Sequence, residues 1–175
     1  MINFKHMLGD VQIYDEGAFG YPGDSAFVTL AAATVINAGE PVLKALGTSG
    51  SFVGPLTTNQ PTIASGSLTA GIAATTGTNT SSANGLVRVT KPTQGLTYLC
   101  APLTAATWNT QAKYDALVGS RVLFDLTNGT YTITASDSAG NGLVVEPLDI
   151  SRYPGKVRFS IRPGATYIGF ATGMS

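Results

Sequence analysis

Few side chains in this sequence could carry out chemistry, and those present are far apart. His6 is the only histidine and Cys100 the only cysteine. Nucleophilic catalysis needs a nucleophile, a base and a group that orients the base, so a Ser-His-Asp or Cys-His arrangement would have to use His6. We expect His6 to face solvent and Cys100, in its apolar context, to pack as a small hydrophobe. One histidine and one cysteine are too few for a zinc site, so no metal is predicted.

Paired carboxylates are the remaining route to acid–base catalysis. Asp15 and Glu16 are adjacent, so on a strand their side chains would point to opposite faces. Acid–base catalysis would need two acids in one cleft with raised or split pKa values, which nothing in their spacing demands. We expect solvated turns and arginine partners, and no enzyme. The acids of the C-terminal half to which this applies are Asp125, Asp137, Glu146 and Asp149.

Glycine-rich segments offer no cofactor site. Asp137-Ser138-Ala139-Gly140-Asn141-Gly142 has the residue types of a calcium loop but lacks its alternating oxygen ligands and closing Glu, so it is predicted to be a β-turn. The chain has no phosphate-cradling Gly-Lys-Ser/Thr loop and no dinucleotide fingerprint. We therefore expect no cofactor.

The few charged residues are distributed unevenly along the chain. Only 11% of residues are charged and the net charge is zero, yet residues 1–40 carry one base and five acids, a balance of 1 − 5 = −4. Residues 151–175 carry four bases and no acid, a balance of +4. Such segments can attract each other across subunits or bind partners of opposite sign. The low overall charge suits a subunit whose surface is partly covered by neighbours.

The basic residues near the C-terminus raise the question of nucleic-acid binding. Arg152 precedes a predicted strand whose outward face carries Lys156, Arg158 and Arg162, with Tyr153 nearby. A basic strand flanked by an aromatic ring can follow a phosphate backbone. Four such charges on a neutral chain would bind weakly and in a salt-sensitive way. We expect a protein partner here and no nucleic acid.

Short strands separated by Gly and Pro turns dominate the predicted secondary structure. Residues 156–162 alternate strictly, with Val157, Phe159 and Ile161 inward. Asn128-Gly129, between two alternating segments, is typical of a two-residue hairpin. The pattern predicts a mainly β fold, a β-sandwich or barrel-like domain.

One short helix is predicted at about 107–118. Thr107 or Asn109 would cap its first turn, and Gly119 would end it in the left-handed conformation. Residues 1–24 are predicted to form an extended N-terminal arm, within which residues 10–14 could form one short strand. Residues 25–175 would form a single β-rich domain, with a Gly/Ser/Thr-rich loop region at 47–85 whose one clear strand is at 71–74.

Targeting signals are not evident in the sequence. No apolar run approaches the roughly 20 residues of a membrane span, so we expect no membrane partner. The first residues lack the charged region, apolar stretch and cleavage site of a secretory signal, so we expect synthesis in the cytoplasm.

Two groups of motifs resemble the capsid cement, or head decoration, proteins of tailed bacteriophages. The first begins with Asn37-Ala38-Gly39-Glu40-Pro41-Val42, which is similar to the Ala-Gly-Glu/Asp-x-Val entry into their β-domain, and continues with Gly71-Ile72-Ala73 and a Gly-Leu-Val-Arg-Val strand at 85–89. The second runs from residue 114 through 121–126 to 154–159 and resembles the C-terminal β-domain of larger cement proteins.

The resemblance implies a structural protein on the outer surface of the virion, made in the host cytoplasm. Its partners would be the major capsid protein and other copies of itself, as a trimer or dimer. The N-terminal arm would add a strand to a neighbour, and the basic C-terminal residues would meet acidic groups. The interface residues expected on this basis are Phe4, Tyr14, Phe19, Tyr21, Arg152, Arg158 and Arg162.

A second hypothesis is a carbohydrate- or surface-binding β-module of a phage fibre or adhesin. Its first candidates for an exposed aromatic site are Trp108 and Tyr114, although packing of Trp108 in the core is the simpler expectation. A third is a glycan-cleaving enzyme that uses two carboxylates.

Overall fold

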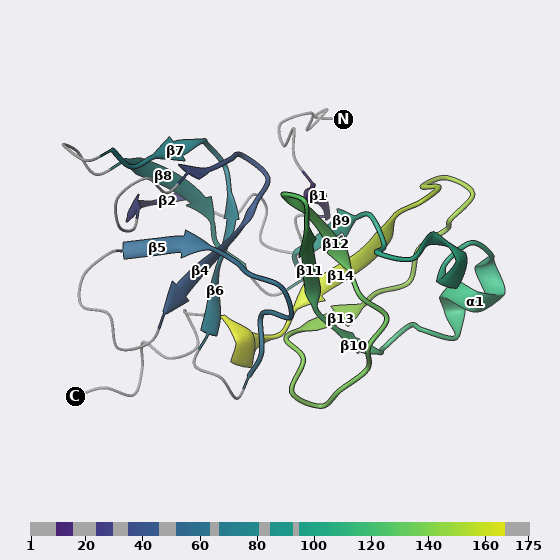
Figure 1. The fold of residues 1–175 in the computed structure, drawn as a ribbon. Helices are drawn as coiled ribbons and strands as arrows, with labels where there is room; N and C mark the ends of the chain where they lie inside the picture. The colour runs from purple at the N-terminus through teal and green to yellow at the C-terminus, as the bar shows by residue number, and fades with distance from the viewer. Residues whose placement is uncertain are drawn as a thin grey trace.

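The computed structural model of the protein describes residues 10–15, 24–29, 35–45, 52–63, 67–80, 85–92 and 95–166. These residues form a mainly β fold built from two parts, a closed five-stranded barrel and a five-stranded antiparallel sheet (Figure 1). The barrel and the sheet lie side by side, and the helix α1 lies at the end of the molecule far from the barrel. The predicted barrel-like β fold class is thereby confirmed.

The barrel has the strand order β2-β5-β4-β6-β8. All of its pairs are antiparallel except the parallel pair β2–β5. Among the side chains that the structure describes, seven small or medium apolar residues form its buried cluster: Ile36, Val42, Val53, Ala70, Ala73, Val87 and Val89. A two-stranded ribbon of β3 (Val35–Ile36) and β7 (Gly77–Thr78) adjoins it. The barrel strands are β2 (Asp24–Thr29), β4 (Pro41–Ala45), β5 (Phe52–Pro55), β6 (Ser67–Ala73) and β8 (Leu86–Thr90).

The prediction of a loop region at 47–85 is wrong where the structure forms β5, β7 and the part of β6 before residue 71. This region supplies β5, β6 and β7, and two of these strands close the barrel. The strand expected at 71–74 is present as the end of β6. β5 was not predicted because it contains Gly54 and Pro55, which normally interrupt strands, and the first part of β6 was not predicted because it is made largely of small residues. Pairing with strands elsewhere in the chain overrides these weak local preferences.

Gly71 allows β6 to lie close to the backbone of β8. Its φ of 139° is accessible to glycine, and an added Cβ would lie 2.0 Å from the carbonyl oxygen of Thr90. The register between β4 and β6 shifts here, since Val42 faces Gly71 and Leu43 faces Thr69, which marks a β-bulge. The bulge bends β6 so that it can pair with β4 on one side and β8 on the other.

The second part is an antiparallel sheet with the order β1-β9-β14-β13-β10. Along β14 buried and half-buried residues alternate, with Val157, Phe159 and Ile161 in the core, as predicted. Phe159 stacks on Tyr98 at 5.5 Å and meets Phe124 edge-on at 5.3 Å. The strands are β1 (Gln12–Asp15), β9 (Thr97–Cys100), β10 (Arg121–Val122), β13 (Leu143–Val145) and β14 (Val157–Ile161).

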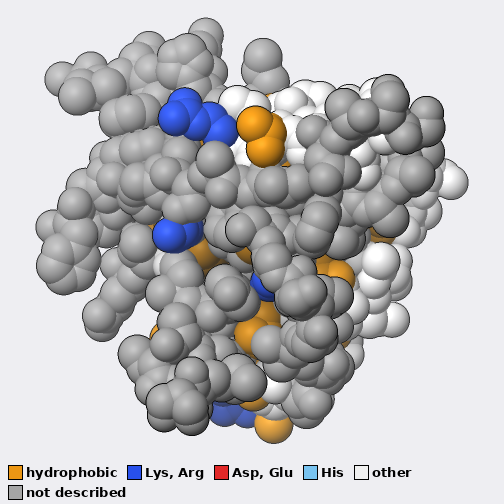
Figure 2. Space-filling model, turned by 90° about the vertical axis from the view of Figure 1, so that its left-hand side faces the viewer, with side chains coloured by type: hydrophobic (Ala, Val, Ile, Leu, Met, Phe, Trp, Pro, Cys, Tyr) orange, Lys and Arg blue, Asp and Glu red, His pale blue; other side chains and the backbone are white. Residues whose placement is uncertain are grey.

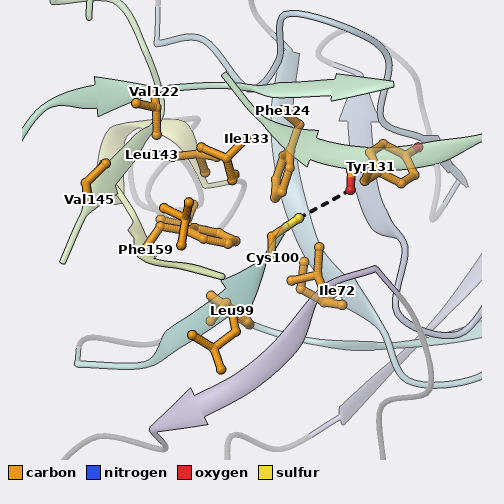
Figure 3. Close-up of a cluster of buried hydrophobic side chains, with 14 of the residues drawn as sticks. Ile72, Leu99, Cys100, Val122, Phe124, Tyr131, Ile133, Leu143, Val145 and Phe159 are labelled. Atoms are coloured by element: carbon orange, nitrogen blue, oxygen red, sulfur yellow. Dashed lines mark hydrogen bonds between the residues drawn. The ribbon is translucent and has the colours of Figure 1, made fainter. Parts of the chain in front are cut away.

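A hairpin of β11 (Phe124–Thr127) and β12 (Thr130–Ile133) covers the core of the sheet (Figure 3). Its turn is the predicted Asn128-Gly129, with φ values of 53° and 79°, as a type I′ turn requires. The buried Cys100 thiol donates to the Tyr131 carbonyl at 3.3 Å, and burial raises the pKa of this thiol to about 12. Cys100 therefore packs as an inert small residue, as expected.

The helical segment is shorter than predicted. α1 spans Gln111–Asp115, preceded by the 3-10 turn η1 (Ala105–Thr107), and a second such turn, η2 (Pro163–Ala165), follows β14. The cap is Thr110, whose hydroxyl accepts from the Lys113 N–H at 3.3 Å, and not Thr107 or Asn109. Gly119 has the predicted left-handed φ, at 86°. No helix among the described residues is long and apolar enough to cross a membrane.

The part of the predicted N-terminal arm that the structure describes belongs to the folded sheet. Residues 12–15 form the edge strand β1, which pairs antiparallel with β9. Asp10 accepts from the Tyr131 N–H at 2.6 Å, so the acidic segment is anchored to its own chain. The short strand expected at 10–14 is present as β1, but residues 10–15 are part of the fold and not an extended arm, and Asp24, the last residue of the predicted arm, begins β2. Phe4, His6, Phe19 and Tyr21 lie outside the described residues.

Candidate functional site

Two of the predicted interface residues, Tyr14 and Arg158, contact each other. Arg158 lies on β14 and Tyr14 on β1, separated by β9. The guanidinium carbon of Arg158 is 4.3 Å from the centre of the Tyr14 ring, the geometry of a cation–π contact. The same guanidinium donates to the Thr97 hydroxyl and the Pro147 carbonyl, both at 3.1 Å. The acidic and basic terminal segments thus meet within one chain at this point.

Tyr153 and Arg152 extend this cluster toward solvent. The rings of Tyr14 and Tyr153 meet edge-on at 5.2 Å. Arg152 approaches the Asp149 carboxylate at 3.8 Å, and their side chains are 79% and 55% exposed, so this ion pair contributes little to stability. Arg152 is the predicted interface residue that the structure leaves most open to solvent among Tyr14, Arg152, Arg158 and Arg162.

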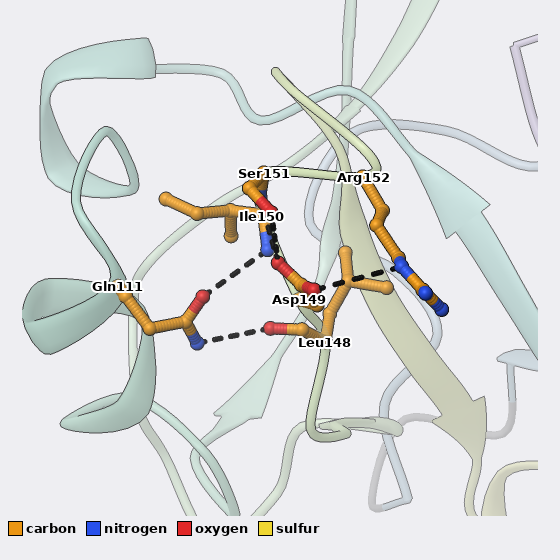
Figure 4. A network of polar contacts seen from close by, with 6 residues as sticks. All are labelled: Gln111, Leu148, Asp149, Ile150, Ser151 and Arg152. Atoms are coloured by element: carbon orange, nitrogen blue, oxygen red, sulfur yellow. Dashed lines mark hydrogen bonds and ion pairs between the residues drawn. The ribbon is translucent and has the colours of Figure 1, made fainter.

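The side chain of Asp149 is held in place mainly by Ser151, two residues later in the chain (Figure 4). Its Oδ1 accepts from the Ser151 hydroxyl at 2.6 Å and from the Ser151 N–H at 3.0 Å. These hydrogen bonds hold the pKa of the Asp149 carboxyl below its usual range, because they favour the charged form. Asp149 therefore remains a carboxylate, and hence a hydrogen-bond acceptor, at neutral pH.

Gln111 ties the same loop to the helix α1, as Figure 4 shows. Its amide nitrogen donates to the Leu148 carbonyl at 3.0 Å and to Asp115 Oδ1 at 2.7 Å. Its amide oxygen accepts from the Ile150 N–H at 3.1 Å. The loop backbone and the Asp115 side chain are thus held by one side chain.

These groups surround an open hollow of about 470 Å³, which we call the Tyr14 hollow. It lies where β1, α1 and the loop before β14 come together. An aromatic ring, two carboxylates and an amide on rigid elements form a surface suited to binding a polar ligand. Its lining residues are Tyr14, Gln111, Asp115, Pro147, Leu148 and Asp149.

Arg162 lies apart from this cluster. Its guanidinium donates to the carbonyls of Ala139 and Asn141, both at 2.9 Å, and so braces the 138–141 turn. The same turn is closed by the Asn141 N–H donating to the Ser138 carbonyl at 3.0 Å, which confirms the predicted β-turn. The role of Arg152, Arg158 and Arg162 in an interface stays a prediction. Within the chain, Arg158 and Arg162 donate hydrogen bonds and Arg152 forms an exposed ion pair.

Three further acids each accept a hydrogen bond from a different residue. Asp137 accepts from the Arg121 N–H at 2.9 Å, Glu146 from the Ser160 hydroxyl at 2.6 Å, and Asp125 from the Thr127 hydroxyl. Among the described residues, no group of three or more His, Cys, Asp and Glu side chains could hold a metal ion.

The aromatic site suggested for carbohydrate binding is buried. Trp108 is 4% exposed and Tyr114 is fully buried, with their rings edge-on at 5.6 Å. The Tyr114 hydroxyl donates to the Glu146 carbonyl at 3.0 Å and accepts from the Arg158 N–H at 2.9 Å, and burial raises its pKa to about 12. Both residues are therefore structural.

Sequence reasoning missed the lining role of Gln111, Asp115, Pro147 and Leu148. The one local signal was the Asp-x-Ser pattern of Asp149 and Ser151, in which a carboxylate accepts a hydrogen bond from the backbone N–H two residues later. Comparison with known proteins adds no relative, since no protein-family model, curated protein or solved structure matches the chain.

Proposed function

We propose that this protein is a structural virion protein that binds the outside of a tailed-phage icosahedral capsid and stabilises it by bridging neighbouring major capsid proteins. The observation that carries the proposal is the convergence of the three N-terminal motifs that resemble cement proteins. Residues 37–42, 71–73 and 85–89 lie on adjacent segments of the barrel, with Val42 facing Gly71 and Ala73 facing Val89.

The first motif forms a tight connection into the barrel. Glu40 accepts from the Asn37 N–H at 2.9 Å and from the Asn37 amide at 2.8 Å. Gly39, with φ of 87°, donates to the Ala73 carbonyl at 2.8 Å and accepts from Val11 at 3.3 Å. The residues of this motif therefore stabilise one local structure together, as we would expect of a motif that belongs to a family fold.

The barrel also carries exposed apolar side chains at one end. Leu86, on β8, is 65% exposed, and Val35, on the adjoining ribbon, is 46% exposed. On the barrel side of the molecule, apolar and basic side chains are in view among the described residues, and no acidic one is (Figure 2). The exposed Leu86 and Val35 favour contact with an apolar protein surface, and we assign the capsid contact to this face.

The mechanism would be stabilisation by mass action. A protein that binds the expanded shell and not its separated subunits stabilises the shell by RT ln(1 + [L]/Kd) at each site. The sum over many sites would oppose the pressure of packaged DNA. The partners in this proposal are the major capsid protein and further copies of this chain, on the outer surface of the virion.

The test is the thermal stability of expanded, empty shells of the parent phage, measured by calorimetry with and without the protein. The wild-type protein is expected to raise the disruption temperature of the shells. Leu86→Lys should abolish most of this rise, because it places a charge in the apolar contact. Leu103→Lys is the matched control, since Leu103 is 46% exposed in the sheet part. Equal shell stabilisation by both variants would contradict the assignment of the contact face, and no rise with wild type would contradict the function.

A further inference from the structure

We propose that the Tyr14 hollow binds a neutral saccharide. This inference does not depend on the capsid proposal, and it moves the carbohydrate hypothesis from the buried Trp108 and Tyr114 to a surface that the sequence did not reveal. The hollow combines aromatic and apolar surface with oriented carboxylates, the combination that a ring with C–H faces and hydroxyl edges would use.

Aromatic and apolar surface lines part of the hollow. Tyr14 lines it, and the ring of Tyr153, which lies outside the lining, packs edge-on against the Tyr14 ring at 5.2 Å. Pro147 and Leu148 add apolar surface from the loop. Tyrosine supplies rigid contact area with a polar tip, so it can contact the C–H face of a sugar while its hydroxyl stays hydrated.

The two carboxylates have acceptor capacity to spare. Asp115 and Asp149 each use Oδ1 for a bond within the protein, to Gln111 and Ser151 respectively. The other oxygen of Asp149 has only the Arg152 guanidinium at 3.8 Å, and that of Asp115 accepts no hydrogen bond from the described residues. Each can therefore accept a charge-assisted hydrogen bond from a ligand hydroxyl.

The site is held in place before any ligand arrives. Gln111 makes three hydrogen bonds that join α1, Asp115 and the loop, and Ser151 fixes Asp149 by two more. Little side-chain entropy would be lost on binding as a result, which matters for a small ligand with few contacts.

The local charge favours a ligand without net charge. Asp115 and Asp149 line the hollow, and Arg152 and Arg158 stand beside it, on Asp149 and on the Tyr14 ring respectively. Two acids and two bases cancel, so a cationic or an anionic ligand gains no net attraction, whereas hydroxyl groups can use acceptors and donors alike.

Saturation-transfer NMR tests this on the full-length chain with methyl glycosides of glucose, galactose, mannose and N-acetylglucosamine. We expect transfer to the ring protons of at least one sugar. Asp115→Asn and Tyr14→Ala should each weaken its binding about tenfold, the effect of losing one charge-assisted hydrogen bond or one aromatic contact. Asp125→Asn, an isosteric change at an acid outside the hollow, should bind like wild type.

Three outcomes would overturn the proposal. The first is no transfer to any of the four sugars, and the second is unchanged sugar binding in both hollow variants. The third is binding of lysine amide, used as a cationic probe, in place of the sugars. Because Tyr14 is only half-buried on the edge strand β1, its replacement keeps the test valid even if Asp115→Asn fails to fold.

Discussion

The barrel and the five-stranded sheet reach stability by different means. The sheet part buries a large core rich in aromatic rings, among them Phe124, Tyr131 and Phe159. The buried cluster of the barrel, as far as its side chains are described, consists of seven aliphatic residues, and the barrel depends on close backbone approach at Gly71. Large side chains tolerate ordinary backbone geometry because they fill space, whereas small ones require the strands themselves to come together.

The two parts are nevertheless joined through one core. Ile72 on β6 and Leu56, which follows β5, are both fully buried in the aromatic cluster of the sheet and not in the barrel interior. Ile72 neighbours Gly71 and Ala73, so adjacent residues of one strand serve the two cores. We therefore expect the described parts to unfold as one cooperative unit.

The largest effect should come from Phe159→Ala in the sheet core. Loss of its contacts with Tyr98 and Phe124 should lower the free energy of unfolding by about 3–5 kcal/mol. Urea denaturation followed by Trp108 fluorescence and far-UV circular dichroism measures this, and both probes should give the same midpoint. Leu103→Ala, at an exposed leucine, is the control and should change the free energy by less than about 0.5 kcal/mol. Separate midpoints for the two probes would contradict a shared core.

The next largest effect on stability should come from Gly71→Ala, which tests the role of close strand approach in the barrel. The φ of 139° and the 2.0 Å approach to the Thr90 oxygen should together cost about 2–3 kcal/mol. Gly140→Ala is the matched control in the sheet part, because a Cβ there meets nothing within 4 Å. Thermal denaturation of the two variants gives the comparison. If Gly71→Ala is as stable as Gly140→Ala, backbone approach is not what shapes the barrel.

The smallest effect on stability should come from loss of the helix cap in the sheet part. Thr110→Ala removes the cap of α1 and should cost about 1 kcal/mol, whereas Thr107→Ala, at a predicted cap that the structure does not use, should cost almost nothing. Urea denaturation of the pair measures the difference. Equal losses would mean that the helix start is set by packing and not by the cap.

The sheet part could largely be predicted from the sequence, because its signals are local. The alternation of β14, the Asn128-Gly129 turn and the left-handed Gly119 each depend on a few neighbouring residues. The barrel could be predicted only in part: the strands expected at 71–74 and 85–89 are present in β6 and β8, but β5 contains Gly54 and Pro55 and becomes a strand only by pairing with β2 and β4. Local preference was misleading there, and the partner strands are distant in the chain.

The candidate site was predictable only in part, for the same reason. Tyr14 and Arg158 were chosen by residue type, and their 4.3 Å contact arises because β1 and β14 flank β9. Gln111 carries no motif, and its importance follows from hydrogen bonds to a loop 37 and 39 residues away. Long-range contacts of this kind leave no pattern in a single sequence.

The central claim, attachment to a capsid, is tested most directly by co-sedimentation of the purified protein with expanded shells of the parent phage over a range of protein concentrations. The account predicts saturable binding at a fixed ratio to the major capsid protein, with the barrel side protected from hydrogen exchange in the bound state. An absence of saturable binding to the shells would contradict it.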